Sequence, residues 1–416
     1  MRFLHTSDWH LGHVLYGKKR YEEFSSFFVW LLKTIDEQKI DTLIVAGDIF
    51  DTTAPSNKAT ELYYDFLAKL KNTICQNVII VAGNHDSPTF LDAPKSILKA
   101  LNVHVVGSVC SNLEDEVITL YNQDKTPAAV IMAIPFLRER DIRSMHQGET
   151  ISEGNKNLRE AMLAHYNNVF EIAAKKQNEY QKENDNYVPI ISTGHLLMTG
   201  TLGAKDKAER EIYIGSLVNI EANDFPTGID YLALGHIHVA QKVGGSEKVR
   251  YSGTPYPMSF GEAGQDKTVV ILDSKDTPLK IEPLSVPEFQ KIVSIKGDVE
   301  SLKEQLQKLI DQNISVYVEA HYTGSENVPS LNDTLRSFVD KTFVSILKVD
   351  NPQAMRKYSA RQASKVETLE ELTPEDVFKK VLDVNNIEEN TPRRQALTTL
   401  FNKLVNDMHD EDKRAE

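Results

Sequence analysis

Four apolar segments of this chain end in the same way, and this repeat most constrains the fold. Each is a mainly apolar run, then a glycine, then a side chain that can bind metal: residues 43–48 (LIVAGD), 79–84 (IIVAGN), 190–195 (IISTGH) and 231–236 (YLALGH). Such runs are typical of strands covered on both faces. Glycine lets the backbone turn sharply or approach an ion, and open α/β sheets bind ligands at their carboxyl edge. We therefore expect the four endings to meet.

The beginning of the chain, FLHTSDWH, is a related ending. It has Ser7 at the glycine position and carries two further metal-binding side chains, Asp8 and His10. The segment at 231–236 continues to a second histidine, His238. Neutral imidazole is a frequent metal ligand, so the closing histidine pair is a candidate for the same site.

Seven side chains form the candidate metal site: Asp8, His10, Asp48, Asn84, His195, His236 and His238. Taken singly, Asp48 fits a helix N-cap, His195 a hydrogen-bonded core histidine, and Asn84 a turn residue. Together they exceed the needs of one zinc ion, whereas two ions about 3.5 to 4 Å apart, bridged by a carboxylate, would use them all. Oxygen and nitrogen ligands without cysteine favour Mn²⁺, with Mg²⁺ as the alternative.

The first part of the chain alternates strand-like and helix-like segments. In order, these are residues 2–7, 21–38, 42–50, 57–70 and 77–83, which read as βαβαβ. Within the first helix, Phe24, Phe27 and Phe28 recur at helical spacing, which predicts core packing and not a nucleic-acid stacking surface. Strand alternation also predicts a core position for Trp9. We predict an α/β fold, a β-sandwich flanked by helices, over residues 1–275.

Two smaller regions follow this lobe. Pro278, Pro283 and Pro287 punctuate a connector. Residues 276–350 then read as a small α+β domain. Residues 351–416 contain a linker and two helices that begin at Thr373-Pro and Thr391-Pro, with threonine as N-cap. These helices either dock on the main body or form a hairpin that binds a partner protein.

Composition limits the classes of function. The 416 residues are 41% hydrophobic and 26% charged, as in globular proteins, and the two cysteines are too few for a disulfide framework. No stretch approaches the roughly 20 apolar residues of a membrane span, and the start does not resemble a signal peptide, so we expect a cytoplasmic protein. The net charge of −13 disfavours nucleic-acid binding by bulk electrostatics, unless bound cations, a basic strip or a partner subunit compensates.

Five motifs follow one another along the chain: Asp8-Trp-His10, Gly47-Asp48-Ile-Phe-Asp51, Gly83-Asn-His-Asp86, Gly194-His195 and Gly235-His-Ile-His238. In this order they resemble the calcineurin-like metallophosphoesterase superfamily. Within it, residues 4–12 (LHTSDWHLG), 134–138 (IPFLR) and 251–255 (YSGTP) resemble a family of bacterial nuclease subunits that work with a coiled-coil ATPase. The resemblance covers essentially the whole chain.

The resemblance implies a role for each site residue. The first ion would be held by Asp8, His10, Asp48 and His238, and the second by Asp48, Asn84, His195 and His236. His85 would face the phosphate as a catalytic residue, and Asp51 would orient its imidazole. The chain departs from the protein Ser/Thr phosphatases of the superfamily, because Thr52 stands where they carry Arg and Asp86 where they carry Glu.

The resemblance also implies partners. It predicts a homodimer within a heterotetramer, an α+β capping domain near the DNA, and C-terminal helices that bind the ATPase. Candidate phosphate contacts are Arg138, Arg140, Arg143, Lys205, Lys207 and Arg210, although single basic residues are more often solvated surface. His13 and Tyr213 are further candidates for the substrate path.

Three functions are open at this point. The first is a Mn²⁺-dependent DNA nuclease with 3′ to 5′ double-strand exonuclease and single-strand endonuclease activity, serving DNA repair, recombination and replication. The second is a phosphodiesterase or phosphatase for small nucleotides, which suits an acidic chain. The third is a scaffold with an unused metal site, which the presence of both His85 and Asp51 disfavours.

Overall fold

The structure is a computed structural model that describes residues 1–143, 151–183, 187–199, 201, 219–275, 277–326, 328 and 330–351, with isolated residues between 378 and 401. The chain forms two compact units, which are described separately: residues 1–324 with 330–350, and residues 325–329 with 351–416. Tyr213, Lys205, Lys207, Arg210 and the helix start predicted at Thr373 lie outside the described residues.

The first six-stranded sheet contains the predicted N-terminal strands. Its strands are β1 (Arg2–Thr6), β4 (Thr42–Ala46), β5 (Asn77–Val81), β6 (Val103–Val106), β13 (Thr268–Asp273) and β14 (Lys280–Ser285). They lie in the order β14-β13-β1-β4-β5-β6, and β1, β4, β5 and β6 are parallel. The carboxyl ends of these parallel strands therefore share one edge, as the sequence predicted.

A second six-stranded sheet packs against the first. Its strands are β7 (Val117–Tyr121), β8 (Pro127–Met132), β9 (Ile190–His195), β10 (Tyr231–Gly235), β11 (Gln241–Lys242) and β12 (Val249–Tyr251), in the order β11-β12-β10-β9-β8-β7. The strands β8, β9, β10 and β12 are parallel. Apolar side chains of both sheets, including Ile44 and Ile191, form the core between them.

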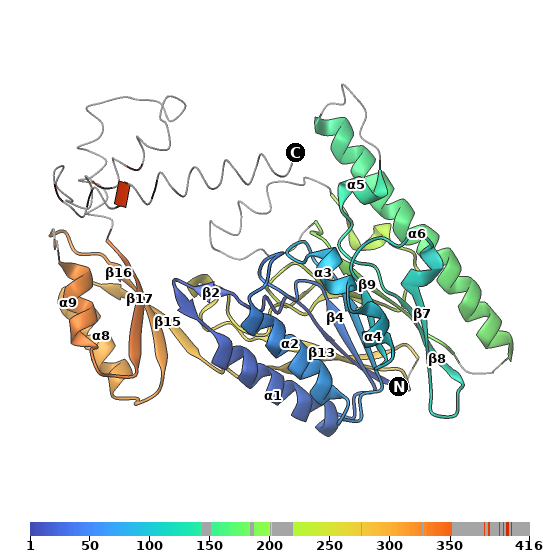
Figure 1. Ribbon diagram of the computed structural model, residues 1–416, viewed down its shortest axis with the longest axis horizontal. Helices are drawn as coiled ribbons and strands as arrows, with labels where there is room; N and C mark the ends of the chain where they lie inside the picture. The colour runs from blue at the N-terminus through green and yellow to red at the C-terminus, as the bar shows by residue number, and fades with distance from the viewer. Residues whose placement is uncertain are drawn as a thin grey trace. The chain divides into compact units, whose positions relative to one another are not determined.

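Helices cover both outer faces of the sandwich (Figure 1). The long helices are α1 (Tyr21–Glu37), α2 (Asn57–Leu70) and α6 (Ile151–Glu183); the short ones are α3 (Pro88–Asp92), α4 (Lys95–Lys99) and α5 (Glu139–Ile142). Short 3-10 turns are η1 (Leu113–Glu116), η2 (Ala222–Asp224) and η3 (Phe260–Glu262). On β4, Leu43 and Val45 face α1 and α2, while Ile44 faces the other sheet, so a nearly continuous apolar run is buried on both faces.

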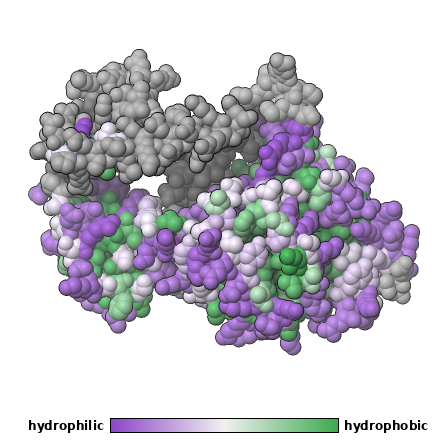
Figure 2. All heavy atoms as spheres, viewed as in Figure 1, coloured by the Kyte–Doolittle hydropathy of each residue, from purple (hydrophilic) through white to green (hydrophobic). Residues whose placement is uncertain are grey.

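The α/β sandwich and the predicted core aromatics are confirmed. Phe24, Phe27 and Phe28 are buried in the cluster beneath α1 and α2. Where the described surface is visible in Figure 2, hydrophilic residues surround and interrupt the apolar ones. Among the described helices, none has both the length and the apolar content to cross a membrane.

The region after residue 275 differs from the expectation. Most of the predicted connector is β14, which pairs antiparallel with β13 and places Pro283 opposite Val270. β14 is an edge strand, and proline is tolerated at a sheet edge where its nitrogen faces the open side. The main sheet therefore reaches Ser285, beyond the predicted end of the lobe at 275.

A three-stranded sheet follows, with the predicted α+β pattern. Its parallel strands are β15 (Lys291–Gly297), β16 (Val316–Tyr322) and β17 (Val344–Asp350), joined by α8 (Val299–Ile310) and α9 (Leu331–Phe338). A two-stranded hairpin of the main lobe, β2 (Val14–Leu15) and β3 (Lys18–Lys19), packs Leu15 with Phe260 and Ile292 of β15.

In the second unit, the described residues include parts of the two predicted C-terminal helices. The rings of Phe378 and Phe401 stack at 4.1 Å. The Arg394 amide donates to the Thr391 hydroxyl at 3.3 Å, as expected of a threonine N-cap. Most of the predicted helical hairpin lies outside the described residues.

Stability at low pH gives a test of the core. His5 is buried, and burial lowers its pKa to about 3. Above about pH 6.5 the His5 ring is neutral in the folded and the unfolded protein, so it does not make the free energy of unfolding depend on pH. As the pH falls from 6.5 toward 3, only the unfolded chain binds a proton at this ring, and the free energy of unfolding decreases. Glutamine does not titrate, so between pH 7 and 4.5 the free energy of unfolding of His5→Gln should fall by roughly 2 to 3 kcal/mol less than that of the wild type.

Urea unfolding in EDTA between pH 4.5 and 7 measures the effect, since the chelator removes any contribution of bound ions. The comparison is the slope of unfolding free energy against pH and not its absolute value. Parallel slopes for the two proteins would contradict a neutral buried His5.

Candidate metal centre

The predicted strand endings meet at one end of the sandwich. The His10 amide donates to the Asp48 carbonyl at 2.9 Å, which joins the endings of β1 and β4. The His85 amide, after β5, donates to Asp48 Oδ1 at 2.9 Å. The His236 amide, after β10, donates to Asp8 Oδ1 at 2.8 Å. Each carboxylate thus ties its own ending to another, and the last bond crosses between the sheets.

Four of the seven predicted ligands have left-handed backbone. Their φ angles are 54° at Asp8, 43° at His10, 50° at Asp48 and 98° at His236. Such conformations cost about 1–3 kcal/mol each and are typical of functional sites whose surroundings enforce them. The sequence shows no pattern that predicts them.

Trp9 is buried as predicted, but for a different reason. The strand β1 ends at Thr6, so alternation does not extend to Trp9. The left-handed residues on either side turn its ring into the core, where it is 0% exposed and meets Phe28 and Phe66 edge-on at 5.1 and 5.4 Å.

The glycines permit the close approach that the sequence suggested. A Cβ on Gly47, where φ is 93°, would collide with the His195 ring, and one on Gly83 with the Asp48 carboxylate. A Cβ on Gly235 would collide with the Ala46 carbonyl of the other sheet. The sheets can therefore converge here only without side chains at these positions.

The donor atoms gather in two groups that share Asp48. One nitrogen or oxygen from each of Asp8, His10 and His238 lies within 4.8 Å of the others. Asp48 Oδ2 lies 3.5 Å from His10 Nε2 and 3.2 Å from His195 Nε2.

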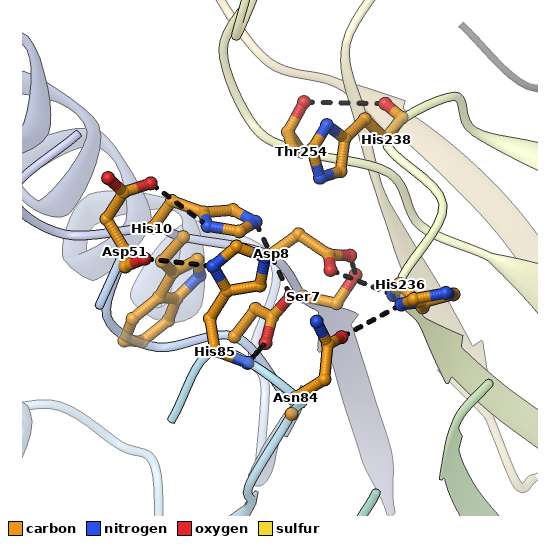
Figure 3. A network of polar contacts seen from close by, with 12 residues as sticks. Ser7, Asp8, His10, Asp51, Asn84, His85, His236, His238 and Thr254 are labelled. Carbon is orange, nitrogen blue, oxygen red and sulfur yellow. Dashed lines mark hydrogen bonds and ion pairs between the residues drawn. The ribbon is translucent and has the colours of Figure 1, made fainter. Parts of the chain in front are cut away.

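Asn84 completes the second group (Figure 3). Its Oδ1 lies 2.9 Å from His236 Nδ1 and 3.0 Å from His195 Nε2. All seven predicted ligands therefore lie in one cluster. The arrangement is compatible with two ion positions on either side of Asp48.

The donor set fits divalent cations. Asp8 and Asp48 are 0% and 2% exposed, and buried carboxylates are costly unless cations compensate them. Both ring nitrogens of His10 are buried without a hydrogen-bond partner among the described residues. Oxygen and imidazole nitrogen donors without sulfur suit Mn²⁺ or Mg²⁺-like ions.

Protonation in the ion-free site follows from the same crowding. Burial opposes a charge on His195, but Asp48 and Asp8 outweigh it and raise the pKa of His195 to about 9. Its Nδ1 lies 2.9 Å from the Ala46 carbonyl and its Nε2 faces Asp48, so acceptors flank the ring on both sides. Burial and the nearby His195 lower the pKa of His236 to about 3.

His85 and Asp51 are close, but the contact differs from the expectation. His85 Nδ1 lies 2.9 Å from the main-chain oxygen of Asp51 and not from its carboxylate (Figure 3). That carboxylate instead lies 3.4 Å from His10 Nδ1 and 3.1 Å from His13 Nδ1. Asp51 therefore contacts the predicted ligand His10 through its side chain and the predicted catalytic residue His85 through its backbone.

The other predicted substrate contacts have different surroundings. Arg138 Nη2 donates to the carbonyl of Asp86 at 2.9 Å, and its guanidinium lies over the Phe136 ring at 5.6 Å. Arg138 thus braces the loop that carries Asn84 and His85. The side chain of Arg140 is 78% exposed and lies 3.5 Å from Asp141. His13 Nε2 lies 3.2 Å from the Met258 carbonyl, beside the site.

One supporting residue was not assigned a role from the sequence. The buried Asp86 carboxylate accepts hydrogen bonds from the amides of Gly83, Ile49 and Phe50 at 2.8, 3.1 and 3.0 Å. It joins the endings of β4 and β5. A polar residue two positions after Asn84 was a weak signal, because its partners come from another loop.

The comparisons with known proteins agree with this geometry. Residues 1–240 match the family described as calcineurin-like phosphoesterase, and residues 288–386 match the type 5 capsule protein repressor C-terminal domain. A relative from Escherichia coli (strain K12), named as the D subunit of the nuclease SbcCD, is 37% identical over 404 residues, which span 96% of this chain and 97% of the relative. This chain belongs to the SbcD family.

A Bacillus subtilis (strain 168) member of the SbcD family is 30% identical over 277 residues, or 66% of each chain. A crystal structure of TT1561 of Thermus thermophilus covers 69% of this chain and 99% of its own, at 13% identity and a TM-score of 0.33. The resemblance inferred from the motifs is confirmed by the sequence relatives. As a member of the SbcD family, the chain is a metal-dependent nuclease, and its Asp and His cluster could hold divalent ions.

Metal binding is expected to release a proton. His195 carries a proton in the ion-free protein below about pH 9, and a metal ligand must be neutral, so Mn²⁺ has to displace it. The apparent affinity of one ion should therefore rise about tenfold per pH unit between pH 7 and 8.5. Calorimetry in two buffers with different ionisation enthalpies should detect about one proton released at pH 7.

His165→Gln is the matched control, since His165 is a buried histidine paired with Glu116 at 2.8 Å and is not one of the seven ligands. The slope of its apparent Mn²⁺ affinity against pH should equal that of the wild type. Binding that is independent of pH would contradict a protonated His195.

Proposed function

We propose that this chain is the nuclease subunit of an SbcCD-type complex. It hydrolyses DNA phosphodiester bonds with two divalent ions, for which Mn²⁺ is the preferred metal and Mg²⁺ the alternative. We further propose 3′ to 5′ exonuclease activity on double strands and endonuclease activity on single strands. The proposal is carried by one observation. Donors from strand ends of both sheets gather around Asp48, and a nitrogen of His85 lies within 4.8 Å of donors of His10 and Asp48.

The ligands divide between the ions. Asp8, His10 and His238 would hold one ion, and Asn84, His195 and His236 the other, with Asp48 shared. Bound divalent ions at such a pair supply Lewis-acid activation and neutralise charge on the phosphate.

The other site residues act on the substrate. The Nδ1 proton of His85 is directed to the Asp51 carbonyl, which leaves Nε2 for the phosphodiester. In its doubly protonated form His85 also carries a proton on Nε2, which would donate a hydrogen bond to a phosphate oxygen or pass to the leaving oxygen and return the ring to the neutral form. Arg138 fixes the carbonyl of Asp86 and so keeps the His85 loop in place. His13 is held beside the site by Asp51 and Met258.

Partners would supply the positive charge for DNA binding that the acidic chain lacks. We propose that residues 351–416 bind an SbcC-type coiled-coil ATPase, and that two copies of this chain form a homodimer within a heterotetramer in the cytoplasm. The small α+β region after β14 would act as the capping domain near DNA. Ions and the ATPase would offset the net charge of −13 at the DNA.

The role of His85 can be tested by substitution. His85→Gln should lower the rate of DNA cleavage about 10²- to 10⁴-fold, because it removes a group that can transfer a proton, while Mn²⁺ content stays at the wild-type level. Cleavage of end-labelled single- and double-stranded DNA is followed with Mn²⁺ or Mg²⁺, with and without the ATPase. Metal content is measured separately on the same preparations.

His104→Gln on β6 is the control and should cleave like the wild type. An unchanged rate for His85→Gln would refute the assignment of His85. If the wild type hydrolyses bis-p-nitrophenyl phosphate or cyclic nucleotides but leaves DNA intact in every condition, the small-nucleotide function replaces the nuclease.

A further inference from the structure

Behind His238 lies a buried carboxylate outside the seven-ligand set. Glu262 ends the turn η3 and is 0% exposed. Its Oε2 forms an ion pair with Lys267. Its Oε1 lies 3.8 Å from His238 Nδ1 and has no hydrogen-bond partner among the residues that the structure describes. A buried carboxylate oxygen without such a partner is costly, so its position beside a metal-ligand histidine calls for a functional reason.

Lys267 is buried as well and joins the carboxylate to the histidine backbone. Besides its pair with Glu262, its Nζ donates to Thr254 Oγ1 at 3.0 Å and to the His238 carbonyl at 3.3 Å. The Thr254 amide also donates to that carbonyl at 3.2 Å. The Thr254 hydroxyl donates to it at 3.4 Å (Figure 3). The backbone of His238 is therefore held from two directions, and Lys267 fixes the carboxylate that faces its ring.

The same turn is anchored on its other side. Phe260, two residues before Glu262, is buried with Leu15 and Ile292. A substitution at Glu262 thus changes the charge behind His238 while the packing of Phe260 continues to hold the turn.

The ring of His238 lies between the carboxylate and the other candidate ligands. Its Nδ1 lies 3.8 Å from Glu262 Oε1, and one of its ring nitrogens lies within 4.8 Å of donors of Asp8 and His10. A histidine that binds metal usually gives its other N–H to a carboxylate or carbonyl, which fixes the tautomer and makes the binding nitrogen more basic. Here the distance of 3.8 Å is longer than a hydrogen bond, and it would shorten if the ring turns toward the carboxylate on binding an ion.

We propose that Glu262 is a positioning residue that orients His238 toward one of the two ions, with Lys267 as its counterion. This rests on the two-ion function proposed above. The competing interpretation is a buried ion pair that only stabilises the fold. The two differ in what they predict for metal affinity, because a purely structural pair would leave Mn²⁺ binding unchanged.

The test is Mn²⁺ calorimetry on the full chain with Glu262→Gln. The wild type should bind two ions. In the variant, the affinity of one ion should fall roughly 10- to 100-fold while the other keeps its value, because only one site uses His238. Thermal unfolding of the metal-free proteins measures any structural effect separately.

A second variant guards against misfolding. Glu262→Gln leaves Lys267 buried without its counterion, so the double variant with Lys267→Met removes both charges and should show the same loss for one ion. The matched control is Glu116→Gln, which alters a buried carboxylate paired with His165 and should keep both affinities.

The outcomes separate the two proposals. The Glu262 variants could bind both Mn²⁺ ions with wild-type affinity and differ only in unfolding temperature. That result would overturn the positioning role and leave the two-ion function intact. A wild type that does not bind two Mn²⁺ ions would overturn the proposed function, and the positioning role with it.

Discussion

Two buried carboxylates, Asp8 and Asp48, place negative charge that the rest of the centre must compensate. Neither is more than 2% exposed, so each needs compensation within the protein. Part of it comes from backbone amides, since Asp8 accepts from His236 and Asp48 accepts from His85. These bonds draw separate strand endings together, and they bring the imidazoles close enough to share an ion. The same negative charge raises the pKa of His195 and so favours the protonated ring in the ion-free site.

The sequence predicted the convergence because the responsible signals are local and repeated. A glycine followed by a metal-binding side chain has the same meaning after each strand, and the parallel order then brings the endings together. The details of contact depend on loop conformation, which has no period. Thus the left-handed backbone of His236 and the turn of the Asp51 carboxylate toward His10 became visible only in the structure. Glu262 was missed because it lies in the turn η3 and does not follow one of the repeated strand endings.

Elements far from the site also divide into those that repeated local signals predict and those that depend on their surroundings. Helix α1 was predicted almost to the residue, since its aromatic stripe is broad. Helix α6 was not predicted, because it buries only a narrow stripe that includes Tyr166, Val169 and Ala173 along a largely polar sequence. The strand β14 was mistaken for a connector, because proline is a turn signal in most settings but is tolerated at a sheet edge.

The order of the ligands along the chain has a consequence for biosynthesis. The first candidate ligand is Asp8 and the last is His238, and their strands belong to different sheets. A growing chain therefore carries an incomplete donor set until β10 has left the ribosome and joined β9. If the centre is the cleaving site, a chain that is cut short before His238 lacks part of the donor set, and we expect it not to cleave DNA.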